Sequence, residues 1–319
     1  MMRAVRVHAF GGPDSMVYEE VPRPEAGPGE VLIRIHAAAL NPLDWVARSG
    51  FAVLPEAMRP KLDLPFTPGT DVSGVVAGVG NGVSQWREGD EVFGLVRFPG
   101  LVNGGKAYAR YTTSPASHLA RKPAGVDHVH AAAVPMAGLT AYQTLFDHIR
   151  LERGKTVLVN GAAGGVGHFA VQLAKATGAQ VIGVASGRHA AFLRDLGVDQ
   201  FIDYTTTAVE KAARDVDHVI DTVGGPRAHR LLPLVKPGGT ISPVTFGDYR
   251  EDRASELGIS FRPGQVRSDG AQMSELARLM ETGRVRPRID SVFPLTDASH
   301  AHRRAEQGHI QGKIVLQVI

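Results

Sequence analysis

The chain has 319 residues, of which 43% are hydrophobic and 21% are charged; its net charge is +3, and it contains no cysteine. The length favours two domains, the composition excludes a disordered, fibrous or coiled-coil protein, and the charge is too small to indicate nucleic-acid binding. The lack of cysteine excludes disulfides, thiolate nucleophiles, iron–sulfur clusters and cysteine-rich zinc sites.

The chain also lacks the signals for export or membrane insertion. Arg3 and Arg6 stand where a signal peptide needs an apolar stretch. The longest uncharged segment, residues 131–146, is shorter than the roughly 20 residues that cross a bilayer. We therefore expect a cytoplasmic protein without membrane contact.

Short β-branched runs separated by Gly/Pro turns dominate the first 122 residues. The runs predicted as strands are Ala4–Val7, Val31–Ile35, Val72–Val79, Glu91–Val96 and Ala107–Thr113. This pattern predicts a mostly antiparallel barrel or sandwich.

Strands that alternate with helices follow, up to about residue 283. The predicted strands are Thr156–Val159, Val181–Val184, Phe201–Ile202, His218–Ile220 and Gly239–Ile241, with helices such as Phe169–Thr177 and Ala190–Leu196 between them. Because strands joined by helices of this length need crossover connections, this part is predicted to be a parallel α/β sheet.

The last segment returns to the first pattern. Strands are predicted at Ile289–Phe293 and Lys313–Val318, around a helix with Thr296 as N-cap and Asp297 in its first turn. We therefore predict that residues 1–122 and 285–319 form one domain, interrupted by an α/β domain at residues 123–284.

A glycine-rich turn provides the strongest local signal. Residues 157–167 read Val-Leu-Val-Asn-Gly-Ala-Ala-Gly-Gly-Val-Gly, between a strand and a helix. Such a turn lets backbone N–H groups approach a pyrophosphate at the helix N-terminus. The predicted dinucleotide contacts are Gly161, Ala163, Gly164, Gly165 and Val166. The alternative is a tight turn without a ligand; a Walker phosphate loop is excluded because no Gly-Lys-Ser/Thr follows.

The next strand indicates which dinucleotide binds. An NAD-binding fold places an acid about twenty residues after the glycines, at the end of this strand. Here Ser186 and Arg188 stand at that point, and Tyr204 follows the third strand. These three side chains are candidates for binding the 2′-phosphate of NADP. The alternative for Arg188 is an exposed cation at a helix start.

Several motifs in order carry a family resemblance. They are residues 38–44 (Ala-Ala-Leu-Asn-Pro-Leu-Asp), 68–74 (Pro-Gly-Thr-Asp-Val-Ser-Gly), the glycine turn, 221–225 (Asp-Thr-Val-Gly-Gly) and 312–316 (Gly-Lys-Ile-Val-Leu). With them the chain resembles the zinc-free medium-chain dehydrogenase/reductase family, in its quinone oxidoreductase (zeta-crystallin-like) branch. The resemblance implies an α/β protein with a GroES-like β-barrel substrate domain, a Rossmann doubly wound parallel sheet, a site in the cleft between them, and a homodimer or homotetramer.

The resemblance also bears on metal binding. In zinc-dependent relatives a Cys ligand stands at the position of Asn41, and a His-Glu pair at Thr70 and Asp71. Because zinc needs four good ligands, we predict that no metal binds. His128, His130, His300 and His302 lack partner ligands and are predicted to lie at the surface.

Further site residues follow from the resemblance. It implies that Thr140, Val223, Val244, Thr245, Phe246 and Gly247 contact the cofactor on its nicotinamide side. Lys313 is either a further cofactor contact or a cation at a strand edge. Trp45, Val46 and Phe246 are substrate-side candidates, with the core as the alternative for Trp45.

Asn41 is the predicted catalytic residue. Its uncharged amide can donate a hydrogen bond to a substrate oxygen or to the nicotinamide ribose, and the alternative is a turn Asn before Pro42. Asp44 is expected to be a helix-start residue rather than a proton donor.

The predicted activity is metal-free hydride transfer from NADPH to a quinone. Val46 replaces a Tyr that quinone oxidoreductases often carry, so reduction of the C=C bond of α,β-unsaturated carbonyls is the alternative. A Lys that relatives carry near the cofactor falls on Ala191, which assigns more of the 2′-phosphate contact to Arg188. A non-catalytic NADPH- or RNA-binding protein is a second alternative.

Overall fold

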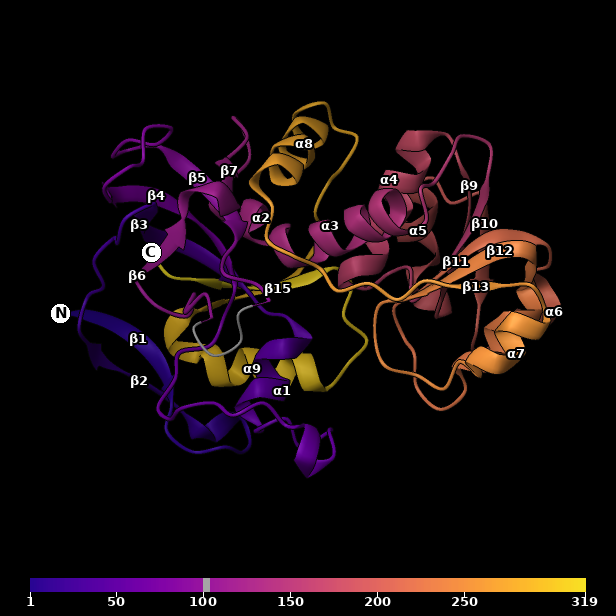
Figure 1. The fold of residues 1–319 in the computed structure, drawn as a ribbon, viewed down its shortest axis with the longest axis horizontal. Helices are drawn as coiled ribbons and strands as arrows, with labels where there is room; N and C mark the ends of the chain where they lie inside the picture. Colours follow the sequence, from indigo (N-terminus) through magenta and orange to yellow (C-terminus); the bar gives the residue numbers. More distant parts are fainter. Residues whose placement is uncertain (100–103) are drawn as a thin grey trace. The chain divides into compact units, whose positions relative to one another are not determined.

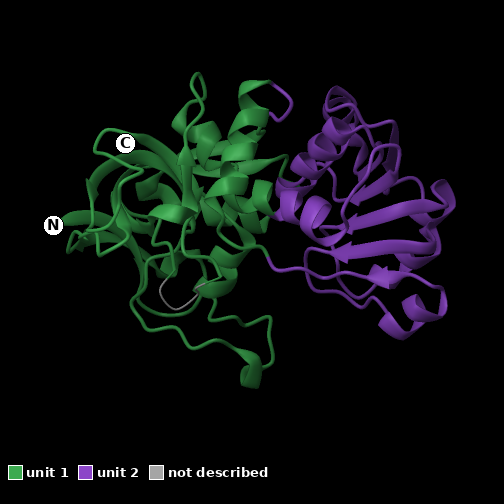
Figure 2. Ribbon diagram, turned by 45° about the horizontal axis from the view of Figure 1, so that its top comes forward, with its two compact units in different colours: residues 1–139, 266–282, 287–319 green, residues 140–265, 283–286 purple. Residues whose placement is uncertain are grey.

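A computed structural model describes residues 1–99 and 104–319 of the chain. Two compact units make up this part (Figure 2): unit 1 comprises residues 1–139, 266–282 and 287–319, and unit 2 comprises residues 140–265 and 283–286. Unit 2 is thus inserted between segments of unit 1. The first unit boundary lies further along the chain than the predicted domain boundary at residue 122.

Unit 1 is built on β-structure (Figure 1). Its strands are β1 (Met2–Val7), β2 (Met16–Val21), β3 (Glu30–Ala39), β4 (Asp71–Val79), β5 (Glu91–Leu95), β6 (Tyr111–Pro115), β7 (Leu119–Arg121), β14 (Ile289–Pro294) and β15 (Lys313–Gln317). β1 and β2 pair with each other, and the other strands form one sheet in the order β14-β15-β3-β4-β5-β7, with β6 also on β3. Only the β14–β15 pair is parallel among these described strands.

The register of β15 on β3 joins the two ends of the chain within unit 1. Val315 lies opposite Ala39, and Leu316 lies opposite Ala38. Both faces of this pairing are buried, because Ala38 and Leu316 pack in the main core while Ala37, Ala39 and Val315 belong to a second buried cluster. This pairing sets Lys313 close to the end of β3, where Asn41 follows.

The helices of unit 1 lie around this sheet. They are α1 (Pro42–Arg48), α2 (His128–Ala132), α8 (Gly270–Glu281) and α9 (Ala298–Glu306), together with most of α3 (Pro135–Tyr142). α1 starts with a capping box, in which Asp44 Oδ2 accepts a 2.8 Å hydrogen bond from Asn41 N. The predicted N-cap Thr296 is wrong, because Thr296 lies inside the 3-10 turn Leu295–Asp297 that precedes α9. Asp297 occupies the N-cap position of α9, without a capping hydrogen bond from its side chain.

Unit 2 is a parallel α/β sheet. Its strands β8 (Thr156–Asn160), β9 (Gln180–Ala185), β10 (Gln200–Asp203), β11 (Val216–Asp221), β12 (Val235–Pro243) and β13 (Ser260–Phe261) run in the order β10-β9-β8-β11-β12-β13. The helices are α4 (Gly165–Thr177), α5 (Ala190–Asp195), α6 (Val209–Ala212) and α7 (Glu251–Glu256). β8, the first strand of unit 2 along the chain, lies inside the sheet between β9 and β11. The strand order therefore reverses at β8, where open α/β sheets bind their ligands.

No helix among residues 1–99 and 104–319 is long and apolar enough to cross a membrane. The cytoplasmic location and the homo-oligomeric state stay predictions.

Candidate active site

The glycine turn of unit 2 joins β8 to α4. Gly161 has a φ of +80°, and a Cβ there would lie 2.3 Å from Thr222 Oγ1. A Cβ at Gly167 would lie 2.2 Å from Gly161 O, so both positions require glycine. Gly164 is the N-cap of α4, and the turn therefore brings free backbone N–H groups to a helix N-terminus.

The other predicted cofactor contacts of unit 2 follow the carboxyl ends of its strands. Ser186 and Arg188 follow β9, Tyr204 follows β10, Val223 follows β11, and residues 244–247 follow β12. Because all these strands are parallel, the segments gather at one edge of the sheet, with the glycine turn among them. Thr140 lies in α3.

Two of these loops are joined directly. Gly225 N donates a 2.9 Å hydrogen bond to Phe246 O, and Val244 N donates one of 2.9 Å to Asp221 O. Phe246 is 83% exposed, and Val223 is also exposed. These two apolar side chains thus project from a hydrogen-bonded frame without being needed in the core of unit 2.

A buried carboxylate that the sequence analysis missed holds this frame. Asp221 accepts hydrogen bonds from Asn160 Nδ2 at 2.8 Å, Tyr249 OH at 2.9 Å and Val223 N at 3.0 Å. Burial and the charge of Asp221 raise the Tyr249 pKa above its usual range, so the phenol stays protonated and donates. Asp221 therefore fixes the loops on either side of the predicted nicotinamide contacts.

Ser186 and Arg188 lie together at the end of β9. Arg188 Nε donates a 3.2 Å hydrogen bond to Ser186 Oγ, and the guanidinium is exposed. The nearby acid is Asp203, at the end of β10. Its Oδ1 already accepts hydrogen bonds from Thr205 N at 2.9 Å and from Thr205 Oγ1 at 2.6 Å. The glycine turn and this hydroxyl–guanidinium pair fit a dinucleotide with a 2′-phosphate.

Asn41 and Lys313 form a buried cluster in unit 1. Lys313 Nζ donates hydrogen bonds to Asn41 Oδ1 and to Leu40 O, and lies 3.7 Å from Asp71 Oδ2. Lys313 is 5% exposed and is therefore no surface cation at a strand edge. Asn41 Nδ2 meets no acceptor with full hydrogen-bond geometry among the residues that the structure describes, and its nearby partner is the Asp71 carboxyl group, whose pKa the amide lowers.

Burial shifts the ionisation of this cluster. It raises the pKa of Asp71 to about 6, against the opposing charge of Lys313 and the Asn41 amide. It lowers the Lys313 pKa, against the charges of Asp71 and Asp44. Burial disfavours the charged form of either group alone, and the Asp71 carboxylate and the Lys313 ammonium therefore stabilise each other's charged form.

A second buried network leads to Asp44. Arg48 NH1 bonds to His302 Nδ1 at 2.9 Å, His302 Nε2 to Tyr108 OH at 3.2 Å, and Tyr108 OH donates to Asp44 Oδ2 at 3.3 Å. Because arginine can only donate, His302 Nδ1 accepts and its proton sits on Nε2. In this row of hydrogen bonds each donor thus points toward Asp44: Arg48 donates to His302, His302 to Tyr108, and Tyr108 to Asp44.

This network corrects the prediction that His302 is a surface residue. His302 is fully buried, and burial together with the Arg48 charge lowers its pKa to about 3. His128 is also partly buried and bonds to Ser73 Oγ at 2.8 Å. His302 and His128 therefore form hydrogen bonds with buried side chains. The lack of metal-ligand spacing around them in the sequence could not indicate this role.

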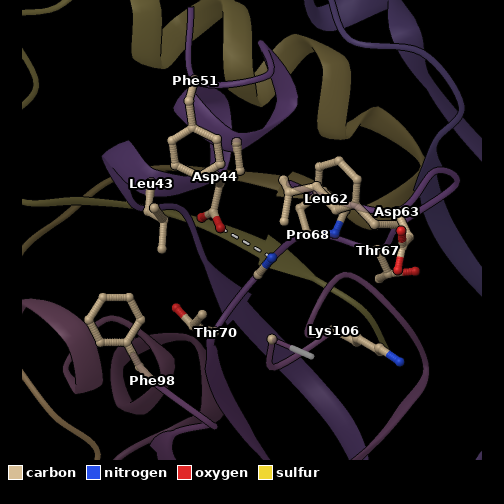
Figure 3. A pocket seen from close by; sticks show the side chains of 14 residues that line it. Leu43, Asp44, Phe51, Leu62, Asp63, Thr67, Pro68, Thr70, Phe98 and Lys106 are labelled. Carbon is tan, nitrogen blue, oxygen red and sulfur yellow. Dashed lines mark hydrogen bonds between the residues drawn. The ribbon is translucent and has the colours of Figure 1, made fainter. Parts of the chain in front are cut away.

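A cavity of about 60 Å³ lies within unit 1, beside α1 (Figure 3). Its walls include the phenyl groups of Phe51, Phe66 and Phe98 and the side chains of Asp44 and Thr70. Trp45 and Val46 are not among its lining residues, and Trp45 packs against the unit 1 core. Sequence reasoning placed no substrate contact on Thr70, although the residue stands in the 68–74 motif.

Two family models match the chain. One, described as alcohol dehydrogenase GroES-like domain, matches residues 27–124, and the other, described as zinc-binding dehydrogenase, matches residues 196–316. The chloroplastic quinone-oxidoreductase QR1 of Triphysaria versicolor is 31% identical over 334 residues, which cover 99% of this chain and 98% of the relative. The chain belongs to the quinone oxidoreductase family of medium-chain dehydrogenases/reductases.

Two further proteins are similar to the chain over its whole length. The chloroplastic NADPH-dependent alkenal/one oxidoreductase of Arabidopsis thaliana is 33% identical, with 100% of this chain and 80% of the relative covered. The quinone oxidoreductase structure from Coxiella burnetii superposes with a TM-score of 0.91 and 33% identity, covering 100% of this chain and 99% of that one. As a member of this family, the chain is an oxidoreductase with a GroES-like domain and a Rossmann-like parallel sheet.

The zinc in the description of one family model does not fit the residues present. Asn41, Thr70 and Asp71 offer an amide, a hydroxyl and one carboxylate, and the Lys313 ammonium already stands 3.7 Å from that carboxylate. A divalent cation there would meet a positive charge. Elsewhere in the described ranges no group of three His, Cys, Asp or Glu residues could hold a metal ion.

Proposed function

We propose that the chain is an NADPH-dependent reductase that transfers a hydride to a quinone without a metal ion. The observation that carries the proposal is the buried Asn41 amide. Its Oδ1 accepts a hydrogen bond from Lys313, and its Nδ2 meets no acceptor with full hydrogen-bond geometry in the described part of the chain, although the amide lowers the pKa of the neighbouring Asp71 carboxyl group. An uncharged donor thus stands at a position where a zinc enzyme of this family would carry a ligand.

The cofactor preference rests on unit 2. Arg188 and Ser186 present a guanidinium and a hydroxyl at the end of β9, where an NAD-specific fold carries an acid. A guanidinium can bind a phosphate through two parallel hydrogen bonds. Bound NADPH supplies the hydride from its nicotinamide ring. The residues of this chain bind and orient it.

A quinone is the proposed acceptor because of the charge that develops on it during the reaction. A quinone that gains a hydride develops negative charge on oxygen, and a fixed donor stabilises that charge without a metal. Asn41 Nδ2 is such a donor, and the Lys313 charge behind Oδ1 strengthens its polarity. The quinone oxidoreductases among the relatives support the same acceptor class.

Reduction of the C=C bond of α,β-unsaturated carbonyls is the second candidate. Its support is the name of the Arabidopsis relative and the presence of Val46 in place of a phenolic donor. Hydride addition to an enone produces an enolate, which needs the same kind of donor at its oxygen.

NADPH oxidation with four acceptors tests the proposal: 1,4-benzoquinone, 9,10-phenanthrenequinone, acrolein and 2-hexenal. We expect turnover with the quinones that exceeds turnover with the enals. Asn41→Asp keeps an oxygen for Lys313 but removes the N–H donor, and we expect it to lower kcat/KM by about tenfold or more. Turnover of enals alone would reverse the order of the two candidates, and no turnover with any of the four would contradict both.

A further inference from the structure

The segment that carries Thr70 is held rigidly by its backbone. Gly69 N donates a 3.1 Å hydrogen bond to Asp44 Oδ1, and Gly69 O accepts one of 3.1 Å from Ala107 N. Thr70 O accepts a 2.8 Å hydrogen bond from Val96 N. With its backbone fixed on both sides, this segment cannot turn to give the Thr70 side chain another environment.

The Thr70 hydroxyl nevertheless has no partner of its own. Thr70 is 6% exposed, it lines the cavity beside α1, and its Oγ1 makes no hydrogen bond with residues 1–99 or 104–319. Figure 3 shows the hydroxyl directed toward the space between Leu43 and Phe98. A buried unpaired hydroxyl costs about 1 to 3 kcal/mol, so its retention at a cavity wall points to a ligand atom.

The other buried polar side chain of the cavity, Asp44, is already engaged. Asp44 Oδ1 accepts from Gly69 N, and Oδ2 accepts from Asn41 N and Tyr108 OH. Because both of its oxygens already accept hydrogen bonds, this carboxyl group has no free donor to offer to a carbonyl or phenolate oxygen. Thr67 and Lys106 also line the cavity, but Thr67 is only partly buried and Lys106 is exposed. Thr70 is therefore the buried donor that this cavity offers to a ligand oxygen.

The remaining walls define the ligand further. Phe51, Phe66 and Phe98 come from three separate segments and give the cavity flat apolar faces. Aromatic side chains pack well against planar conjugated rings. The volume of about 60 Å³ admits the carbonyl end of such a ring rather than the whole of a large one.

We propose that Thr70 binds the acceptor: its hydroxyl donates a hydrogen bond to a carbonyl oxygen of a flat aromatic quinone, which enters this cavity between the phenylalanines. The hydroxyl keeps its proton, so Thr70 binds and orients the acceptor but transfers nothing to it. This inference rests on the proposed function, because it assumes a carbonyl compound as the acceptor.

Isosteric substitution tests the inference. Thr70→Val removes the hydroxyl and keeps the shape, and we expect kcat/KM for 9,10-phenanthrenequinone to fall by about tenfold to a hundredfold. Thr70→Ser keeps the hydroxyl and should stay within about threefold of wild type. Thr296→Val, an exposed position in unit 1, makes the same chemical change away from the cavity and should leave the activity unchanged.

A binding measurement separates this inference from the proposed function. The affinity for 9,10-phenanthrenequinone, measured by titration calorimetry without NADPH, should fall by about tenfold or more in Thr70→Val and be restored in Thr70→Ser. Binding that depends on Thr70 without NADPH oxidation would contradict the proposed function and support the site. Equal binding by wild type and a folded Thr70→Val, or equal losses in Thr70→Val and Thr70→Ser, would overturn the inference.

Discussion

Lys313 donates a hydrogen bond to Oδ1 of Asn41, a residue 272 positions earlier in the chain. The contact exists because β15 pairs with β3, which brings the last strand beside the segment that starts α1. Since a lysine can only donate, it must face the oxygen of the amide, and Nδ2 faces away from it. The orientation of the predicted catalytic amide is thus set from the far end of the chain.

Removal of the Lys313 charge should destabilise unit 1. Lys313→Met leaves Asp71 buried without its cation, and we expect the free energy of unfolding to fall by about 3 to 5 kcal/mol. Adding Asp71→Asn removes the orphaned charge and should recover part of that loss. Denaturant unfolding of both single variants and the double variant measures the coupling; strictly additive losses would show that the two charges do not interact.

The Ser186–Arg188 pair should determine the cofactor preference. Arg188→Ala is expected to weaken NADPH binding by about tenfold to a hundredfold while leaving NADH binding unchanged, because only NADPH carries the 2′-phosphate. Arg194→Ala, an exposed arginine on α5, is the matched control and should leave both affinities as they are. Isothermal titration with the two cofactors measures the effect, and a wild-type preference for NADH would contradict the assignment.

Gly161 should be far less tolerant of a side chain than a glycine of similar φ. Gly154→Ala has open space around its Cβ and a φ of +81°, so it reports backbone strain alone, about 1 to 2 kcal/mol. Gly161→Ala adds the 2.3 Å clash with Thr222 Oγ1 and should destabilise more and abolish NADPH binding. Thermal unfolding with and without NADPH tests this; similar behaviour of the two variants would remove the steric argument.

His302 should make the protein less stable in acid. The unfolded residue takes up a proton near pH 6.5, whereas burial and Arg48 lower its folded pKa to about 3. The unfolded state therefore binds more protons between these values, and stability falls as the pH drops, by up to about 1.4 kcal/mol per unit.

The pH effect is isolated by a difference measurement. Burial raises the pKa of Asp44 to about 7, which favours the folded state on acidification and partly masks the effect of His302. Between pH 6.5 and 5, wild type should lose about 1.5 to 2 kcal/mol more than His302→Asn, which does not titrate. An equal loss in both proteins would show that His302 does not titrate as its burial implies.

Local patterns predicted the sheets of both units well. β8, β9 and β11 coincide with predicted strands to within two residues at each end because buried parallel strands are continuous apolar runs. The prediction Ala107–Thr113 was displaced from β6 (Tyr111–Pro115), since Ala107 and Tyr108 are core residues that bond to residues 68 and 69 outside the sheet. β13 is only two residues long and has no periodicity to detect.

The site was predictable only where a local motif carries it. The glycine turn and the Ser186–Arg188 pair are close in sequence, so their spacing reveals them. The Thr70 cavity and the Arg48–His302–Tyr108 network depend on residues distant in the chain. No spacing rule connects such residues, and their role follows from burial and hydrogen-bond direction in the folded unit.

Hydride transfer without a metal ion is tested most directly by the rate of NADPH oxidation with 9,10-phenanthrenequinone. The protein is first treated with a strong chelator and assayed for bound zinc. We predict that the rate is unchanged when the zinc content is far below one ion per chain, because Lys313 and Asn41 stand where a metal would be. Loss of the activity on chelation, with recovery on addition of zinc, would contradict this prediction.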